Sequence, residues 1–595
     1  MQTVQEKLLQ TRELMRAAGV AAFIVPSTDP HVGEYTPDYW KTRAWLSGFT
    51  GSAGTLVVTS EKAGLWTDSR YFLQAEKQLE GSGITLFKSG LPETPSFYEW
   101  IASELVAGEC VGIESEVFTA SEAKNLIRFF EKKGLKIITD FAPQNEIWEN
   151  RPSLPLNPCF ILPERFSGKS SKEKIAEVLK LMEKNNADIT IVAALDSIAW
   201  LFNLRGDDIE YNPVCVCYAV VSKDETALFI DTRKLTEEVA DYLASQGVHI
   251  AEYKKIARYI SQIPDDKQVL ISPSKINYHL YSLIPKKCKT VETDNHPIDL
   301  LKSKKNETEI AGFRSVTLKD GVALVKFQIY LEKALASGEK LTELSVTEKL
   351  HQFRDEQEFF VGESFATIAG YNAHGAIVHY EADAESDAEI HPEGILLIDS
   401  GGQYFDGTTD ITRTYILSEP SEEVKRDYTN ILKGNIALAS ARFPKGTHGV
   451  QLDILARQFL WQDATNYLHG TGHGVGHFLN VHEGPQAIRM NYVPSTIEVG
   501  MVTSNEPGLY RTGKYGLRIE NIMLTVADRT TEFGDFMSFE TLTLCPIDKR
   551  AIDKSLMSKQ EIDWLNNYHS NVYNLLSPLL SEDEKLWLKE KTGEL

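Results

Sequence analysis

The sequence predicts a chain of mixed α/β and α+β character, and two observations support this. Up to about residue 300, short apolar runs typical of buried strands alternate with amphipathic helical patterns, as in α/β domains. Between residues 360 and 545, glycines and short alternating strands dominate, and eight of the fourteen histidines lie between 374 and 482. A chain of 595 residues also exceeds what one hydrophobic core usually holds, so several domains are expected.

The N-terminal region opens with a predicted amphipathic helix that ends at Gly19, and the apolar run 20–26 predicts a strand. Charges interrupt the apolar positions of this helix, so it lacks the features of a secretory signal. The stretch 147–158 contains three prolines and no periodicity, which indicates a linker. We therefore expect a first α/β domain over residues 1–150.

A second alternating segment covers residues 151–303, with strands expected near 188–194 and 213–221. Its sequence partly repeats that of the first segment, because each contains Ala-Trp-Leu followed by a strand that ends in Asp-Ser-Arg (68–70) or Asp-Thr-Arg (231–233). So short a repeat can arise by chance. Order and context both repeat, however, which favours a duplicated α/β domain.

The lysine-rich stretch 301–310 marks the start of a third domain, expected over residues 304–595. A long helix is predicted to about residue 335. The tail 558–595 predicts helices with an apolar stripe, and Ser581 begins a capping-box spacing. Such a stripe is as consistent with packing on the same domain as with a subunit contact.

Composition and missing motifs exclude several classes of protein. The net charge of −22 argues against nucleic acid and anionic membranes as partners, and no apolar segment reaches eighteen residues. The six cysteines are scattered without CxxC spacing, as expected of reduced thiols in a cytoplasmic protein. There is no HExxH, GxxxxGK[ST] or GxSxG motif, so a zincin, a P-loop and a serine-hydrolase elbow are excluded.

Carboxylates at the ends of predicted strands are the residues most able to carry chemistry. In GILLIDSGGQYFDGTTDITRTYIL, Asp399 ends an apolar strand and Asp410 lies in the returning strand, which can place the two side by side. In SNEPGLYRTGKYGLRIEN, Glu506 precedes a turn and Glu520 follows a further short strand. Each acid alone could be a turn residue, a cap or the partner of an arginine such as Arg518.

The stretch HGTGHGVGHFLNVHEGP, residues 469–485, adds histidines to these acids, among them the glycine-flanked His473. Two Asp and two Glu carry −4 beside one neutral His, and two divalent cations carry +4. Without cations, a buried cluster of four carboxylates would have to take up protons. Oxygen ligands with one imidazole suit Mn²⁺, although Zn²⁺, Co²⁺ and Fe²⁺ would also bind.

These five residues carry a resemblance to the pita-bread metallopeptidases, the group that contains methionine aminopeptidase, prolidase and aminopeptidase P. Within it, the chain most resembles the cytosolic three-domain branch, in which two creatinase-like α/β domains precede a pita-bread catalytic domain. The segments 26–59, 147–155 and 469–485 and the motif SNEPGLY carry this closer resemblance, which covers nearly the whole chain.

The resemblance implies a role for each ligand of a dinuclear metal centre. Asp410 and Glu520 would bridge two divalent cations. Asp399 would complete the ligands of one cation, and His473 and Glu506 those of the other. Mn²⁺ is the cation expected first, with Zn²⁺ or Co²⁺ as alternatives.

The resemblance also implies residues for catalysis and substrate binding. His379 is similar to a histidine that contacts substrate, and His482 to one that hydrogen-bonds near the scissile carbonyl. His469 is expected near the substrate pocket, and Arg518 beside the metal ligands and the substrate. His379, His482 and Glu506 are the residues expected to act in catalysis, and Glu506 would shuttle the proton.

Three histidines receive no role from the resemblance. His477 departs from close relatives, which often carry a smaller residue there. His374 and His391 are expected at the surface. The glycines of 469–485 are expected to let the backbone pass close to the metals and the substrate.

The implied activity is hydrolysis of the bond between an N-terminal residue and a following proline, with a hydroxide held between two metals as nucleophile. Peptides with a penultimate proline would be the substrates, and a homodimer in the cytoplasm is expected. Three alternatives stay open: a prolidase acting on Xaa-Pro dipeptides, a non-catalytic binding protein of the same fold, and a creatinase-like hydrolase that works without metal.

Overall fold

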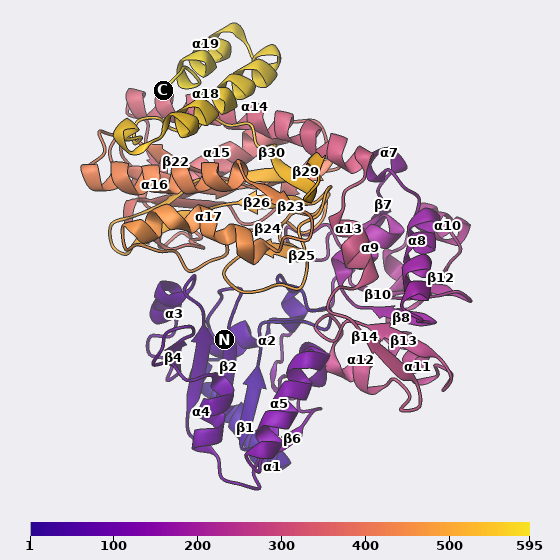
Figure 1. Cartoon of the computed structure of the whole chain (residues 1–595). Coiled ribbons are helices and arrows are strands. Elements are labelled where there is room, and N and C mark those ends of the chain that lie inside the picture. The colour runs from indigo at the N-terminus through magenta and orange to yellow at the C-terminus, as the bar shows by residue number, and fades with distance from the viewer. Residues whose placement is uncertain (1) are drawn as a thin grey trace. The chain divides into compact units, whose positions relative to one another are not determined.

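The structure is a computed structural model that describes residues 2–595, and the chain divides into two compact units. The first unit runs as far as Ile298. The second holds the chain from Asp299 onward together with two short inserts, Leu162–Gly168 and Tyr211–Pro213. Figure 1 follows the chain from indigo at the N-terminus to yellow at the C-terminus. In residues 2–595, no helix combines the length and the apolar character needed to span a membrane.

The first sheet of unit 1 has the strand order β4-β3-β2-β1-β5-β6. Its strands are β1 Ala22–Val25, β2 Thr55–Thr59, β3 Ala63–Thr67, β4 Thr85–Lys88, β5 Cys110–Gly112 and β6 Lys136–Ile138. Its helices are α1 Val4–Ala18, α2 Thr42–Ser47, α3 Phe72–Gln78, α4 Phe97–Glu104, α5 Ala120–Lys132 and α6 Gln144–Ile147. As predicted, α1 ends where Gly19 adopts φ 67°, and the run 20–26 contains a strand, every residue of which is buried.

The second sheet repeats this arrangement with the order β12-β11-β10-β8-β13-β14. Its strands are β8 Ile189–Val192, β10 Cys217–Ser222, β11 Thr226–Ile230, β12 Val248–Glu252, β13 Gln268–Ile271 and β14 Lys289–Glu292. The other elements of this region are β7 Phe160–Ile161, α7 Glu164–Ser167, α8 Ser171–Lys184, α9 Leu195–Phe202, β9 Leu204–Arg205, α10 Glu237–Ser245, α11 Ile256–Ser261, α12 Tyr278–Ser282 and α13 Pro297–Ser303.

The two sheets also pair their strands in the same directions. β1 is antiparallel to β2 and parallel to β5, and β8 is likewise antiparallel to β10 and parallel to β13. The repeated Asp-Ser/Thr-Arg motif follows the equivalent strands β3 and β11. In each copy the arginine binds the aspartate through two nitrogens, Arg70 to Asp68 and Arg233 to Asp231. This common topology supports the predicted duplication. The linker predicted over 147–158 contains no helix or strand after Ile147, the last residue of α6. The exact boundaries at residues 150 and 303 stay predictions.

One half of unit 2 packs two helices on a small sheet of order β17-β19-β22. Its elements are α14 Glu307–Ser337, β15 Leu341–Thr342, α15 Glu343–Asp355, β16 Phe360–Glu363, β17 Ile368–Tyr371, β18 Glu389–Ile390, β19 Ile395–Ser400, β20 Gly402–Tyr404, β21 Gly407–Thr408 and β22 Ile411–Ile416. Leu324 and Phe327 of α14 and Leu350 of α15 share a buried core with Leu396 and Ile398 of β19. The long helix predicted to about residue 335 is confirmed.

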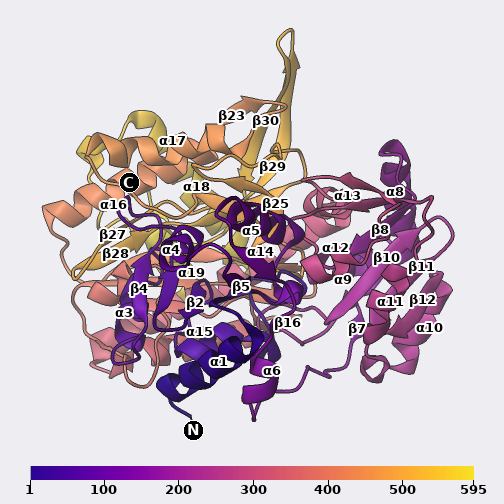
Figure 2. The same ribbon diagram turned by 90° about the horizontal axis from the view of Figure 1, so that it is seen from below.

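The other half packs α16 Glu422–Ala439 and α17 Gly449–Gln462 on a sheet of order β23-β30-β29-β26-β24-β25. Its strands are β23 Arg442–Pro444, β24 Gly472–Gly474, β25 Glu483–Ile488, β26 Val502–Asn505, β29 Asn521–Thr531 and β30 Gly534–Thr541. A separate hairpin joins β27 Gly508–Arg511 to β28 Tyr515–Arg518. β29 and β30 extend beyond their sheet as a long hairpin (Figure 2).

The C-terminal tail forms α18 Lys559–Leu576 and α19 Glu582–Lys591, which lie against α14 (Figure 1). The capping box predicted at Ser581 is present, with Glu584 as its second member. Leu565, Val572 and Leu576 are fully buried in the core of unit 2. The apolar stripe therefore packs on its own domain.

Candidate metal centre

The first two predicted ligands lie at two adjacent strands of the small sheet, Asp399 within β19 and Asp410 just before β22. Asp399 is the penultimate residue of β19, and the antiparallel register of β19 and β22 places it opposite Thr412. Asp410 directly precedes β22, so the prediction that it lies within the returning strand is wrong by one residue. The reason is that the chain makes a small hairpin, β20 and β21, before β22 begins.

His473 occupies the middle of β24, between two glycines whose hydrogen side chains are needed for packing. A Cβ on Gly472 would collide with the carbonyl oxygen of Ser504 in β26, and one on Gly474 with that of Glu483 in β25. That these glycines also bring the backbone close to metals and substrate stays a prediction. They let β24 lie tightly between its two neighbours, which holds the His473 backbone in a defined place.

The two glutamates lie at the ends of strands, as predicted. Glu506 directly follows β26, and Glu520 lies between β28 and β29. Glu520 is 1% exposed, whereas the Glu506 side chain retains 18%. Ser504 donates a hydrogen bond to Glu506 at 3.2 Å, and Thr412 donates one to Glu520 at 2.8 Å.

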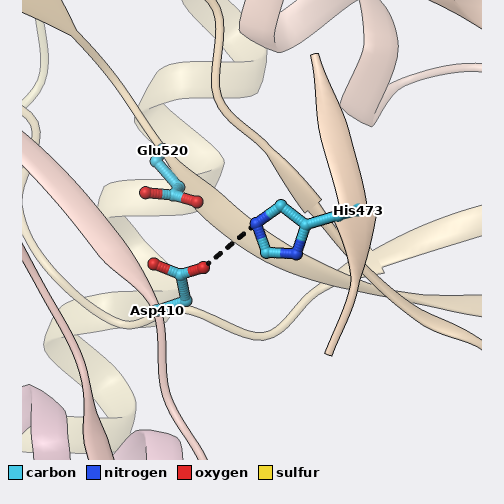
Figure 3. A group of neighbouring side chains, drawn as sticks. All are labelled: Asp410, His473 and Glu520. Carbon is cyan, nitrogen blue, oxygen red and sulfur yellow. Dashed lines mark ion pairs between the residues drawn. The ribbon is translucent and has the colours of Figure 1, made fainter. Parts of the chain in front are cut away.

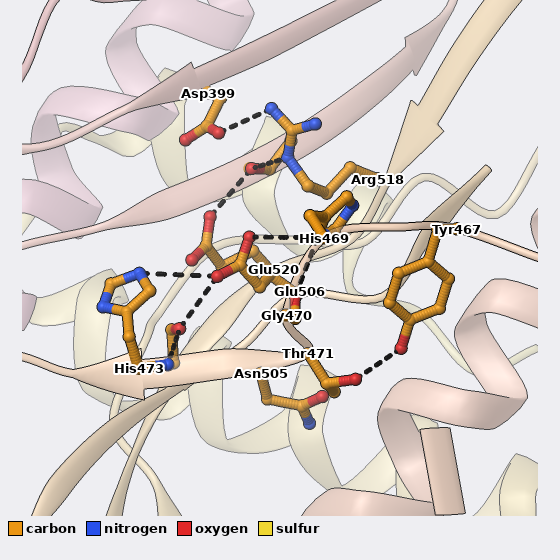
Figure 4. A network of polar contacts seen from close by, with 12 residues as sticks. Asp399, Tyr467, His469, Gly470, Thr471, His473, Asn505, Glu506, Arg518 and Glu520 are labelled. Atoms are coloured by element: carbon orange, nitrogen blue, oxygen red, sulfur yellow. Dashed lines mark hydrogen bonds and ion pairs between the residues drawn. The ribbon is translucent and has the colours of Figure 1, made fainter. Parts of the chain in front are cut away.

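Five side chains from these separate strands converge. One ligand atom each of Asp410, His473 and Glu520 lies within 4.8 Å of the others (Figure 3). His473 Nε2 is 3.4 Å from Asp410 Oδ2 and 3.4 Å from Glu506 Oε1. Asp399 lies in the same polar network through Arg518 (Figure 4). Four carboxylates and one imidazole thus meet in one place, although they come from positions up to 121 residues apart.

The donor set fits divalent cations. Among residues 2–595, Asp399 Oδ1 and Glu520 Oε1 are buried and accept no hydrogen bond. A buried carboxylate oxygen without a partner costs free energy, which a bound cation would recover. Carboxylate oxygens with a single imidazole match the preference of Mn²⁺ and related divalent ions.

Burial and mutual repulsion raise the pKa values of these acids. Burial raises the pKa of Asp410 well above its ordinary value, and the neighbouring charges of Asp399 and Glu506 add to this effect. The pKa of Glu520 is raised by burial and by Asp410. Burial raises the pKa of Glu506 to about 7, against the opposing influence of Arg518. A metal-free cluster therefore holds protons near neutral pH.

This predicts how the stability of the metal-free chain depends on pH. A carboxyl group whose folded pKa exceeds its unfolded pKa binds more protons when folded, so stability falls as pH rises between the two values. For Glu506 that window runs from about 4.5 to about 7. We expect the melting temperature in EDTA to fall across this window, and Mn²⁺ to raise it more at pH 7.5 than at pH 5. Differential scanning fluorimetry measures both.

The matched variant for this prediction is Glu506→Gln. Its melting temperature in EDTA should fall less steeply with rising pH than that of the wild type. Asp29, with a pKa raised by burial to about 6, and Glu114, raised by burial to about 7, act with the same sign in both proteins. The difference between the two curves therefore isolates Glu506. Identical curves would contradict the assignment of this titration to the cluster.

Arg518 connects the acids to the rest of the site. Its guanidinium donates to Asp399 Oδ2 at 2.6 Å, to Thr412 Oγ1 at 3.0 Å and to the Tyr510 hydroxyl at 2.6 Å. Tyr510 in turn lies 2.8 Å from His469 Nε2. The sequence interpretation missed Thr412 and Tyr510. Strand periodicity could have found Thr412, because it lies two residues after Asp410 and so faces the same side.

The remaining predicted substrate residues lie at different distances from the cluster. The His482 ring packs edge-on against His473, with centroids 4.4 Å apart. His469 Nδ1 is 3.9 Å from Glu506 Oε2. His379 is half-buried in the segment that precedes Tyr380, and its place beside the substrate stays a prediction.

Two histidines without a predicted role have structural ones. His374 was expected at the surface, and its side chain keeps 32% exposure, but its Nδ1 also lies 2.9 Å from the fully buried carboxylate of Glu343. Glu343 also accepts a hydrogen bond from Tyr380 at 2.8 Å. His477 is 2% exposed and packs against Phe313 of α14, so it is a core residue. His391 is exposed, as predicted.

Family profiles match almost the whole chain. The Creatinase/Prolidase N-terminal domain matches twice, over residues 7–143 and 150–309. Metallopeptidase family M24 matches residues 313–527, and the C-terminal region of peptidase M24 matches residues 535–595. These matches confirm the predicted fold class.

Full-length relatives narrow the family further. The chain is 41% identical over 610 residues to the probable Xaa-Pro aminopeptidase P of Coprinopsis cinerea, covering 99% of this chain and 98% of the relative. It is 40% identical over 630 residues to aminopeptidase P2 of Arabidopsis thaliana, covering 100% and 89%. The crystal structure of X-prolyl aminopeptidase from Caenorhabditis elegans, described as a cytosolic enzyme with a di-nuclear active site, superposes with a TM-score of 0.96 at 35% identity over all of both chains. The chain therefore belongs to the M24 metallopeptidases and, within them, to the Xaa-Pro aminopeptidase P family.

Proposed function

We propose that this chain is a Xaa-Pro aminopeptidase, a metallo-aminopeptidase that hydrolyses the bond between an N-terminal residue and a penultimate proline. The observation that carries the proposal is the convergence of Asp410, His473 and Glu520 within 4.8 Å. Full-length relatives 40–42% identical to the chain bear the name aminopeptidase P, which supports the same activity.

The proposal assigns the five converging side chains to two divalent cations, with Mn²⁺ as the expected metal. Asp410 and Glu520 would bridge the two ions, Asp399 would complete one ligand set, and His473 with Glu506 the other. Bound there, the cations supply Lewis acidity and make water a nucleophile at neutral pH. The unpartnered oxygens of Asp399 and Glu520 support this assignment.

The proton transfers fall to Glu506 in this proposal. Its side chain keeps 18% exposure at the edge of the cluster, so the carboxylate can exchange a proton with a water or substrate there. It would take a proton from the attacking water and return it to the proline nitrogen, which must be protonated to leave as a secondary amine. Its position 3.4 Å from His473 Nε2 places it at the cluster where this transfer is needed.

His482 would act on the carbonyl oxygen of the scissile bond. Its ring packs against His473 and so borders the metal ligands. A hydrogen bond from its imidazole to the oxygen would stabilise the negative charge that develops during attack. His379 and His469 would hold the peptide, and the Tyr510 hydroxyl connects His469 to the buried guanidinium of Arg518 behind them.

Substrate length tests this proposal against the prolidase alternative. After treatment with EDTA, activity on Xaa-Pro-Pro should be lost, and Mn²⁺ should restore it. An Xaa-Pro dipeptide should not be cleaved in either state, because an aminopeptidase P requires a residue after the proline. Release of the N-terminal amino acid, followed by mass spectrometry, measures both substrates in parallel.

Each alternative has its own outcome in this experiment. Cleavage of the dipeptide alone would favour a prolidase. Full activity in EDTA would favour a creatinase-like hydrolase that works without metal, and no activity after Mn²⁺ addition would favour a non-catalytic binding protein. The presence of all five ligand residues argues against the last two.

The proposal also includes a homodimer and a cytosolic location, as expected from family likeness. Light scattering of the purified chain measures the oligomeric state. Metal analysis of protein purified without added ions identifies the bound cation, and two manganese ions per chain are expected.

A further inference from the structure

A buried ion-pair cluster is centred on Glu483, the residue that follows His482. The carboxylate of Glu483 binds two ammonium groups: Lys302 Nζ at 2.7 Å from Oε2, and Lys305 Nζ at Oε1. All three side chains are only 1% exposed. Lys305 Nζ also donates to the carbonyl oxygen of Lys302 at 3.1 Å, which closes the cluster.

Stability alone is a poor explanation for this arrangement. Removing charged groups from water costs several kcal/mol for each ion, so buried ion pairs are often no more stable than apolar side chains of similar size. What such a cluster does provide is a fixed geometry, because the ammonium groups and the carboxylate lose their bonds if they move. The relevant question is which atoms this geometry holds in place.

The Glu483 backbone is next to two histidines of the candidate site, His482 along the chain and His473 across the sheet. Glu483 directly follows His482 in the chain, and it is the first residue of β25. Across the sheet its partner is Gly474, which directly follows His473. The absence of a Cβ on Gly474 allows the Glu483 carbonyl to approach closely. A fixed Glu483 therefore fixes the position of the His482 backbone relative to the His473 backbone.

The two lysines are themselves anchored to the same sheet. Lys302 lies in α13, and Lys305 directly precedes Asn306, the N-cap of α14. Between them, the backbone of Lys304 pairs with that of Met501 in an isolated antiparallel β-bridge. The Lys305 amide also donates a hydrogen bond to the Gly500 carbonyl oxygen at 2.9 Å. Met501 directly precedes β26, which leads to Glu506. The cluster thus ties the residue after His482 to the strand that precedes Glu506.

We infer that Lys302, Lys305 and Glu483 form a positioning clamp that sets the place of His482 relative to the metal ligands during hydrolysis. In this inference the three residues are positioning residues, which act through His482 and not on the substrate. The inference rests on the proposed function, because it concerns the group that stabilises the developing charge on the carbonyl oxygen.

The test compares Lys302→Met and Lys305→Met with Lys304→Met, the matched control. Lys304 belongs to the same segment but is exposed and pairs with Glu498 at the surface. With Mn²⁺ bound, each clamp variant is expected to lose roughly tenfold or more in kcat on an Xaa-Pro-Pro peptide, as partners of active groups typically do. KM should change less than twofold, because substrate binding is not altered. The control should match the wild type.

A double-mutant cycle shows whether the loss passes through His482. If the clamp acts only by placing this histidine, Lys305→Met should lower kcat less than twofold in a His482→Gln background. Glu483→Gln keeps the shape of the side chain and provides a second variant if a lysine variant folds poorly. Melting temperature and metal content, measured for every protein, show that folded and loaded chains are compared.

Opposite results would overturn the inference. If Lys302→Met and Lys305→Met have the same kcat as Lys304→Met, the cluster has only a structural role. The same conclusion follows if Lys305→Met lowers kcat by the same factor in the wild-type and His482→Gln backgrounds. If the wild-type chain cleaves Xaa-Pro-Pro while the variants give either of these results, the clamp is overturned and the proposed function stands. If the wild-type chain is inactive with Mn²⁺, the proposed function and the clamp are both overturned.

Discussion

Replacing Asp410 with asparagine is expected to lower kcat/KM on an Xaa-Pro-Pro peptide by more than roughly a thousandfold, because bound metals can lower the pKa of water by about nine units and this residue is the proposed bridge. Addition of Mn²⁺ to the chelated variant should not restore activity. Isothermal titration calorimetry should show that at least one of two Mn²⁺ sites is lost.

The same variant should be more stable than the wild type when metal is absent. Asparagine removes a buried group that repels Asp399 and Glu506, and this repulsion together with burial raises the pKa of Asp410. A higher melting temperature in EDTA would therefore accompany the loss of activity. This separates loss of the site from loss of the fold.

Glu419→Gln is the control, because the Glu419 side chain is 85% exposed and forms a surface ion pair with Lys425. It should leave activity and Mn²⁺ binding unchanged. Full turnover by Asp410→Asn would show that the bridging assignment is wrong, however well the other four side chains converge.

Replacing Arg518 with methionine is expected to lower the free energy of unfolding by about 3–5 kcal/mol, the cost of leaving a buried charge without its partner. Arg518 is 2% exposed, and its guanidinium lies 2.6 Å from Asp399 Oδ2. The change also removes the donors to Thr412 and Tyr510. Mn²⁺ affinity should fall roughly tenfold to a hundredfold, because the variant no longer orients a ligand.

Urea denaturation of the metal-free chain measures the change in the free energy of unfolding. Isothermal titration calorimetry measures the change in Mn²⁺ affinity. Arg529→Met is the matched control, because Arg529 is exposed and its partner Asp528 lies on the projecting hairpin. That variant should change stability by less than about 1 kcal/mol. Equal effects of the two substitutions would mean that Arg518 does not compensate a buried charge.

Much of the local structure follows from the sequence, for reasons that act over a few residues. Apolar runs bounded by turn residues predicted β1 and β8, and the spacing from Ser581 to Glu584 predicted the start of α19. The echo of Asp-Ser/Thr-Arg pointed to two sheets of equal topology. Capping, periodicity and turn chemistry are properties of neighbouring residues, and a sequence displays them directly.

The candidate ligands were also recognisable, because glycines, short strands and acids recur at characteristic spacings. Their roles were not contained in that pattern. Asp399 could equally have been a turn residue, and Glu520 the partner of Arg518. Only the register of β19 with β22 and the close packing of β24 between β25 and β26 bring them to His473.

By itself, then, the sequence predicted several strands and helix ends, the two related sheets and the order of five candidate metal-binding side chains. Tertiary structure alone decided that Arg518 would join Asp399 to Tyr510, that His374 would bind the buried Glu343, and that Lys302 and Lys305 would reach Glu483 across about 180 residues of chain. The physical reason is that local patterns depend on bonded neighbours. Contacts between distant residues depend on how whole strands and helices pack, which no short spacing records.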